Sequence, residues 1–171
     1  MLVIVALVII LGLFFTVFFG PPYVPARGKD VAVAFDELYP LSKHDVVLDL
    51  GSGDGKVLRA ASRRGAKAVG YELHPLLVGI TKLLSRGDKN VAVHWGNFWN
   101  VPFPDNTTVV YMFGDGRDIE RFTKKIEAEA SRLHRQLHVI SYGFVLPRHT
   151  CIKQLGAHNL YAVRPLHSKK P

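Results

Sequence analysis

The segment from Asp45 to Gly55, DVVLDLGSGDG, constrains the fold of this 171-residue chain more than any other stretch. The residues after Asp45 are β-branched and apolar, which is typical of a buried strand, and this run ends at Asp49. Three glycines, at positions 51, 53 and 55, then alternate with polar residues, and a helical pattern follows. Glycines in such a turn let the backbone approach a ligand closely. Strand, glycine turn and helix together predict a ligand site at the carboxyl end of a parallel strand.

A second strand, Ala66 to Tyr71, is expected to deliver Glu72 at its end, where a carboxylate can bind the two hydroxyls of a ribose. A dinucleotide fingerprint would need a third glycine three residues after the second, and Lys56 stands there instead. The spacing, with Asp49 in front of it, resembles the first motif of class I S-adenosylmethionine-dependent methyltransferases. The alternative is a structural glycine turn in another α/β protein.

Composition sets the class of partner and the redox context. The formal net charge is +8 and the pI about 9.7, which favours nucleic acid or an anionic membrane surface as partner. The alternative is a basic protein kept soluble by its charge. The single cysteine, Cys151, excludes an internal disulfide framework. It lies in a strand-like run, where a core position is more typical than a nucleophile.

Residues Met1 to Phe19 carry no charge. As a helix this run would span about 28 Å, close to the thickness of the hydrocarbon core of a bilayer. A retained membrane anchor is the favoured interpretation, and a cleaved signal peptide or a buried core helix are the alternatives. Because the first basic residues, Arg27 and Lys29, follow the apolar run, the positive-inside rule places the rest of the chain on the cytoplasmic side, or on its matrix equivalent.

The expected architecture is an α/β, Rossmann-like sheet, mostly parallel with an antiparallel C-terminal hairpin, preceded by one transmembrane helix. The expected divisions are an anchor at 1–20, a proline-rich connector at 21–29, the catalytic domain at 30–166 and a basic tail at 167–171. Asp30 is the expected N-cap of the first helix of the domain. Helices are expected at 30–41, 56–64, 75–86 and 117–136, strands at 46–48, 66–71, 91–95, 107–113 and 137–142, and the hairpin at 150–155 and 159–163.

Four stretches carry a narrower resemblance: PPYVPA at Pro21–Ala26, VVLDLGSGDGKV at Val46–Val57, VGYELHPLLV at Val69–Val78 and GNFW at Gly96–Trp99. In these, and in their order along the chain, the sequence resembles the small membrane-anchored lysine methyltransferases that modify the mitochondrial adenine nucleotide translocase and the ATP synthase c subunit, with their prokaryotic relatives. The resemblance implies a protein-lysine N-methyltransferase that uses S-adenosyl-L-methionine and acts on a membrane protein with a membrane-proximal lysine.

The resemblance also implies which residues hold the cofactor. The loop Tyr23–Pro25 is expected to fold over it, although Ala26 stands where the family usually has Thr or Ser. Asn97 stands where an acidic residue is common; its amide oxygen is a candidate acceptor for the adenine amino group. A ring from Phe98 or Trp99 would cover the adenine, the alternative being an aromatic patch under a loop. The expected cofactor-binding residues are Tyr23, Val24, Asp49, Gly51, Ser52, Gly53, Asp54, Gly55, Glu72, Leu73, Asn97 and Phe98.

The methyl acceptor is expected at the tip of the strand at 107–113, which faces the cofactor across the topological switch point. Tyr23, Trp99 and Asp115 are candidate catalytic residues there. No general base is assigned, because Asp115 could equally cap the next helix. Aromatic residues such as Tyr111 and Phe113 would line a channel for the acceptor lysine. That lysine must be neutral, and deprotonating it at pH 7 costs roughly 4.6 kcal/mol.

Other chemistries find less support in the sequence. The eight histidines are scattered without HExxH spacing, and no GxSxG elbow is present, so no metal is expected. No NPPY-type sequence follows the fourth strand, which disfavours a DNA adenine methyltransferase. The basic residues of the helix at 117–136 are better interpreted as a solvated face than as a nucleic-acid site. Two alternatives stay open: a membrane-tethered module that binds the cofactor or a nucleic acid without turnover, and a methyltransferase with a small-molecule or lipid acceptor.

Overall fold

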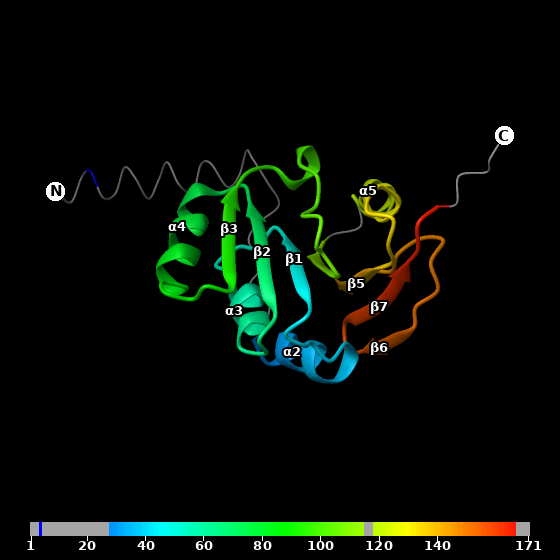
Figure 1. Ribbon diagram of the computed structural model, residues 1–171, viewed down its shortest axis with the longest axis horizontal. Coiled ribbons are helices and arrows are strands. Elements are labelled where there is room, and N and C mark those ends of the chain that lie inside the picture. The colour runs from blue at the N-terminus through cyan, green and yellow to red at the C-terminus, as the bar shows by residue number, and fades with distance from the viewer. Residues whose placement is uncertain (1–3, 5–27, 115–117, 167–171) are drawn as a thin grey trace.

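A seven-stranded mixed sheet organises the part of the chain that the computed structural model describes, which is residue 4 and residues 28–114 and 118–166. The strand order is β3-β2-β1-β4-β5-β7-β6 (Figure 1). The first five strands in this order are parallel, and β7 is antiparallel to both of its neighbours. The expected parallel sheet with a C-terminal hairpin is therefore confirmed. The strands are β1 Val46–Leu50, β2 Lys67–Glu72, β3 Val91–Trp95, β4 Val109–Phe113, β5 Leu137–Tyr142, β6 Lys153–Leu155 and β7 His158–Val163.

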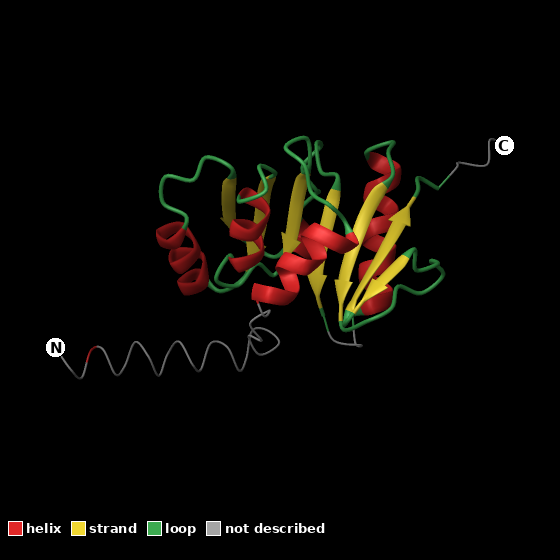
Figure 2. Cartoon of the chain, turned by 90° about the horizontal axis from the view of Figure 1, so that it is seen from below, coloured by secondary structure: helices red, strands yellow, loops and turns green. Residues whose placement is uncertain are grey.

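Helices cover both faces of the sheet (Figure 2). One face packs on α2, on the π-helical turn η1 that continues it, on α3 and on α4, whereas α5 covers the other face. A short 3₁₀ helix, η2, follows β3. The helices are α2 Gly28–Val33, η1 Ala34–Leu38, α3 Lys56–Ser62, α4 Pro75–Leu84, η2 Phe98–Asn100 and α5 Ile119–Arg132.

Two hydrophobic cores result, one on each face. Successive residues of a strand point to opposite faces, so parallel strands buried on both faces need nearly continuous apolar runs. Every residue of β1 is buried. Phe35 and Leu58 fill the core under η1 and α3, while Phe122 and Ile126 of α5 fill the other core, and all four are fully buried.

Several predicted boundaries shift. The first helix begins at Gly28, two residues before the predicted N-cap, Asp30. The N-cap prediction was wrong. Asp30 lies in the first turn instead, where an acid also stabilises the helix N-terminus, through the helix dipole. The strand expected from residue 107 begins at Val109, because the Thr108 hydroxyl is engaged with Asp45 and accepts a bond from the Val46 amide. Cys151 is half-buried and precedes β6 rather than lying in a strand.

The expected anchor and connector lie almost entirely outside the described residues. In the ranges that are described, no helix combines the length and the apolar composition needed to cross a bilayer.

Candidate functional site

β2 and β3 lie on one side of β1, and β4 lies on the other side of β1 and parallel to it. The direction in which successive strands are added to the sheet therefore reverses between β1 and β4. In open α/β sheets the ligand lies outside the carboxyl ends of the strands at such a switch point. Asp49 pairs in register with Gly70 of β2 and Tyr111 of β4. The predicted motif residues therefore stand at the place where this fold binds its ligand.

The glycines of the turn adopt backbone conformations that residues with a side chain disfavour. Gly51, Gly53 and Gly55 all have positive φ, at 84°, 53° and 75°, a region that glycine enters without strain. The amides of Gly51 and Ser52 donate to the Tyr71 carbonyl at 2.9 and 3.1 Å. A Cβ on Gly51 would meet no atom within 4 Å. The turn is thus anchored to β2 and has open space above Gly51.

Glu72 lies at the end of β2, as predicted, and its carboxylate is held by two backbone amides. Gly53 donates to Oε2 and His74 donates to Oε1, each at 2.8 Å, and Glu72 is only 9 % exposed. A carboxylate oxygen can accept more than one hydrogen bond. The carboxylate is therefore fixed in orientation and retains acceptor capacity for a ligand's hydroxyl groups.

Asp49 is buried beneath the glycine turn, 3 % exposed. No group in the described part of the chain donates a hydrogen bond to its carboxyl. Burial, and then the charges of Glu72 and Asp54, raise the pKa of Asp49 to about 8. An acid kept out of water beside two other acids favours a positively charged ligand, which would relieve the repulsion.

Thr81 supports the turn from α4 and was not predicted. Its side chain is fully buried, and its hydroxyl donates to the Gly53 carbonyl at 3.0 Å. A Cβ on Gly55 would lie 2.4 Å from Thr81 Cγ2, so glycine is also required here for contact with α4. The available signal was that Thr81 is the single hydroxyl residue of α4.

The segment expected on the adenine side follows β3. The Asn97 Oδ1 atom accepts a hydrogen bond from the Trp99 amide at 3.1 Å and so caps η2. Because an amide oxygen accepts two bonds, one acceptor position remains for a ligand. The Phe98 and Trp99 rings pack at 4.6 Å, and the Arg121 guanidinium lies 4.2 Å from the Trp99 ring centre. Leu73 follows Glu72 and is partly exposed.

An aromatic wall lies at the carboxyl ends of β4 and β5 and at the amino end of the antiparallel β7. Phe113, at the tip of β4, stacks on Tyr142 at 5.2 Å, and Tyr142 meets His158 edge to face at 4.7 Å. The Tyr111 hydroxyl lies 3.0 Å from His158 Nε2. Burial lowers the pKa of His158 and raises that of Tyr111, where the Asp49 charge adds to the effect. His158 was not predicted, and no sequence pattern marked it.

The remaining predicted residues are placed as follows. Tyr23, Val24 and Asp115 lie outside the described residues. Ser52 is buried, and Asp54 accepts a bond from the Lys56 amide at 3.1 Å. Among the residues that are described, no three His, Cys, Asp or Glu side chains are grouped so that they could hold a metal ion.

The sheet order, the glycine turn and the acids beside it define the fold of class I, Rossmann-like methyltransferases. Residues 49–153, more than half of the chain, match the family described as the ANTKMT methyltransferase domain, and the chain belongs to that family. The resemblance to this lysine methyltransferase family is confirmed, whereas the membrane anchor expected with it stays a prediction.

Individual relatives agree with this placement. A protein-lysine N-methyltransferase of Saccharolobus islandicus (strain REY15A) is 33% identical over 130 residues, covering 72% of this chain and 76% of that protein. The lysine N-methyltransferase of the ATP synthase c subunit, from Xenopus laevis, is 33% identical over 129 residues, covering 74% of this chain and 54% of that protein. The chain spans about half the length of the vertebrate relatives of this name.

Among solved structures, an RNA methyltransferase from Salinibacter ruber in complex with S-adenosyl-L-homocysteine superposes with a TM-score of 0.70. The match covers 86% of this chain and 97% of that chain at 24% identity. This likeness shows the fold.

Proposed function

We propose that the chain is a protein-lysine N-methyltransferase that uses S-adenosyl-L-methionine. The observation that carries the proposal is the pairing of Glu72, oriented by the glycine turn, with Asp49 buried beneath that turn. Family membership supports it, since relatives of the family are named lysine N-methyltransferases.

The residues present fit this cofactor. Glu72 offers acceptor positions to the two ribose hydroxyls, and the open space above Gly51 admits the ligand close to the backbone. None of the groups that shift the pKa of Asp49 is a cation, so a cationic ligand would supply the missing counter-charge. When bound, the cofactor supplies the activated methyl group. The protein's contribution is alignment of the acceptor with that group.

The aromatic wall of Tyr111, Phe113 and Tyr142 suits a lysine acceptor. An ammonium must lose its proton before it can accept a methyl group, and a low-dielectric channel lowers a lysine pKa. Phe113, at the tip of β4, is 38 % exposed, whereas Tyr111 is buried beside Asp49 in the sheet. A lysine side chain entering past Phe113 would leave water before it reaches the site.

The proposed substrate is a membrane protein with a lysine close to the bilayer. The uncharged segment Met1–Phe19 would anchor the chain, with the domain at 30–166 on the cytoplasmic or matrix-equivalent side. An anchor raises the effective concentration of acceptor lysines near the membrane. The domain divisions inferred from the sequence belong to this proposal.

The experiment is methyl transfer by the full chain, incubated with methyl-tritiated S-adenosylmethionine and membranes of the source organism. We expect label in lysine side chains of a membrane protein, located by mass spectrometry. Glu72→Ala should abolish the label, and Glu37→Ala, at an exposed acid of η1, should retain it. Cofactor binding without any transferred label would instead indicate a binding module, and label in the lipid or small-molecule fraction a different acceptor.

A further inference from the structure

Helix α4 presents large apolar side chains to solvent. Leu76, Leu83 and Leu84 are 61, 70 and 55 % exposed, although a helix on the outside of a sheet normally turns polar residues outward. Leu76 and Leu83 are seven residues apart and share one face. Trp95, at the end of β3, is 69 % exposed. Its indole N–H donates to the Leu73 carbonyl at 3.0 Å, so Trp95 and Leu73 belong to the same apolar surface. Leu73, Leu76, Leu83, Leu84 and Trp95 are called the α4 patch below.

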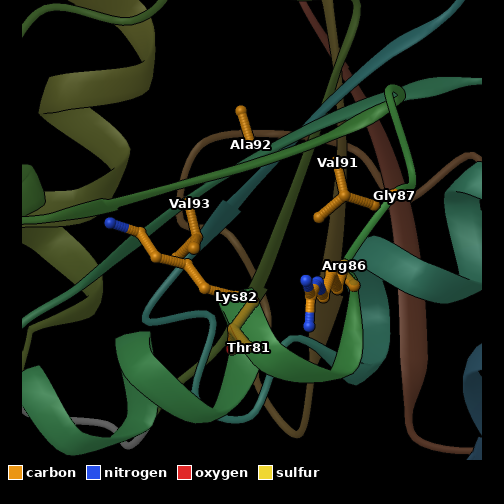
Figure 3. Close-up of a pocket in the computed structure, with 8 residues that line it drawn as sticks. Thr81, Lys82, Arg86, Gly87, Val91, Ala92 and Val93 are labelled. Carbon is orange, nitrogen blue, oxygen red and sulfur yellow. The ribbon is translucent and has the colours of Figure 1, made fainter.

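A cavity of about 380 Å³ opens beside the patch, between the C-terminal half of α4 and β3. In Figure 3 the Lys82 side chain runs from α4 past Val93 of β3, and Arg86 lies in the turn that follows the helix. Within the described residues, neither of these cations forms an ion pair, and the Ser85 hydroxyl in the cavity is buried without a hydrogen-bond partner. The cavity therefore offers two cations and one hydroxyl to an anion. Its lining is Thr81, Lys82, Ser85, Arg86, Gly87, Val91, Ala92 and Val93.

Acidic residues are missing from this surface. No Asp or Glu occurs from Leu73 to Gly87. The next acid, Asp88, accepts hydrogen bonds from the Ser62 hydroxyl and the Asn90 amide, so its charge is engaged within the fold. A leucine-rich surface rimmed by cations alone is typical of a helix lying in the interface of an anionic bilayer. A polynucleotide would bind the cations but would make no contact that explains the exposed leucines.

We propose that the α4 patch and the cavity beside it dock on an anionic lipid bilayer. The leucines and Trp95 enter the interfacial layer, where tryptophan is favoured, and Lys82, Arg86 and the Ser85 hydroxyl hold a lipid phosphate. Charge complementarity selects this occupant. Membrane docking is separate from methyl transfer, but it affects where the cofactor site lies. Leu73 follows Glu72 directly, so docking holds the cofactor end of the sheet near the membrane surface.

The test uses depth-dependent quenching of Trp95 by brominated phospholipids. The chain has two tryptophans, Trp95 and Trp99, so Trp99→Phe leaves Trp95 as the sole reporter in the full chain. Protein is floated with vesicles of phosphatidylcholine, with or without about 30% phosphatidylglycerol, and only the floated fraction is measured. Any tethering by the N-terminal segment is then common to all samples, and quenching reports the orientation of the domain. We expect at least twofold stronger quenching in the anionic vesicles.

Charge reversal supplies the matched variants. Lys82→Glu with Arg86→Glu should abolish the gain in anionic vesicles, whereas Lys43→Glu with Lys67→Glu, at exposed lysines outside the patch, should preserve it. Trp95 unquenched in the floated Trp99→Phe protein would overturn the proposal, and blue-shifted unquenched emission would show that protein covers the patch. Loss of polynucleotide affinity in the first variant, with quenching intact, would also overturn it. Calorimetry with S-adenosylmethionine should be unchanged in both variants, so failure of docking and failure of the proposed reaction are distinguishable.

Discussion

Two buried acids stand at opposite ends of β1 and are treated in opposite ways. Asp45, at the amino end, is 9 % exposed and its carboxylate accepts four hydrogen bonds. They come from the Ser42 amide and hydroxyl at 2.9 and 2.8 Å, from the Thr108 hydroxyl at 3.0 Å and from the Tyr39 hydroxyl at 3.1 Å. Burial alone would raise the pKa of Asp45, but these donors hold it below its usual value. Asp49, at the carboxyl end, has no such donor among the described residues, and its pKa is raised to about 8.

The difference separates an acid that stabilises the fold from one that serves the site. Burying a charged group is costly unless its partners are supplied. At Asp45 the protein supplies them, and the carboxylate ties η1, the loop before β1 and the start of β4 together. At Asp49 the partner is left to the ligand, which is how strongly shifted pKa values come to mark functional sites.

The largest effect is expected from Asp45→Ala. The change removes the shared acceptor of the Ser42 amide and hydroxyl and of the Thr108 and Tyr39 hydroxyls at a part-buried place, which should cost about 3 kcal/mol of unfolding free energy. For a chain of this size the midpoint of thermal unfolding should fall by roughly 6–12 °C. The affinity of the folded protein for S-adenosylmethionine should stay within threefold of the wild type. Asp36→Ala, at an exposed acid paired with Arg64, is the control and should leave the midpoint nearly unchanged. A stable Asp45→Ala protein would contradict the structural role.

The reverse pattern is expected from Asp49→Asn. Loss of the counter-charge should weaken cofactor binding about 30-fold, which corresponds to roughly 2 kcal/mol. The free protein should become more stable at pH 8, by about 1 kcal/mol, because a buried like-charged contact is removed. Calorimetry and denaturant unfolding of the same sample measure both quantities. Weakened binding together with lower stability would mean that Asp49 is a structural acid like Asp45.

A feature of the fold or of the site could be predicted from the sequence where neighbouring residues along the chain determine it. The strand at Val91–Trp95 and the helix start at Pro75 were predicted as observed, because apolar periodicity and proline position are local properties. The position of Glu72 followed from the strand before it. The mostly parallel sheet with its antiparallel C-terminal hairpin followed from the resemblance together with the element order.

The hydrogen-bond partners were beyond local patterns. Asp45 was taken only as the residue before the strand at 46–48, since its donor Thr108 is 63 residues away. The Tyr111–His158 contact spans 47 residues and joins β4 to β7, and neither residue stands in a recognisable motif. Asn97 was assigned to the ligand from its position after β3, and only the structure shows that its amide oxygen also caps η2.

Smaller losses of stability and of cofactor affinity should follow from Thr81→Val. This substitution tests whether the carboxyl end of β1 also depends on structural hydrogen bonds. The substitution keeps the shape but removes the donor to the Gly53 carbonyl, so about 1 kcal/mol of unfolding free energy should be lost. Because Gly53 also donates to Glu72, cofactor affinity should fall about fivefold, less than in Asp49→Asn. Thr123→Val on α5, whose hydroxyl bonds a helix carbonyl on the opposite face of the sheet, is the matched control. Equal losses of affinity in the two variants would show a general stability effect.

The smallest effect is a pH dependence of the free protein, and its sign distinguishes the two acids. The folded-state pKa of Asp49, about 8, lies above the ordinary value of 3.8, so between these values the folded state binds more protons than the unfolded state. Stability from Asp49 is therefore complete at low pH and is lost as pH rises toward 8. Asp45, whose pKa is lowered, contributes stability at neutral pH that is lost only in acid. The lowered pKa of His158 likewise costs stability only below about pH 6.5. From pH 7 to 8 we expect a loss of about 1 kcal/mol, or roughly 3 °C, in unfolding scans without cofactor. Asp49→Asn should flatten this slope, and a slope that survives the substitution would assign the titration to another group.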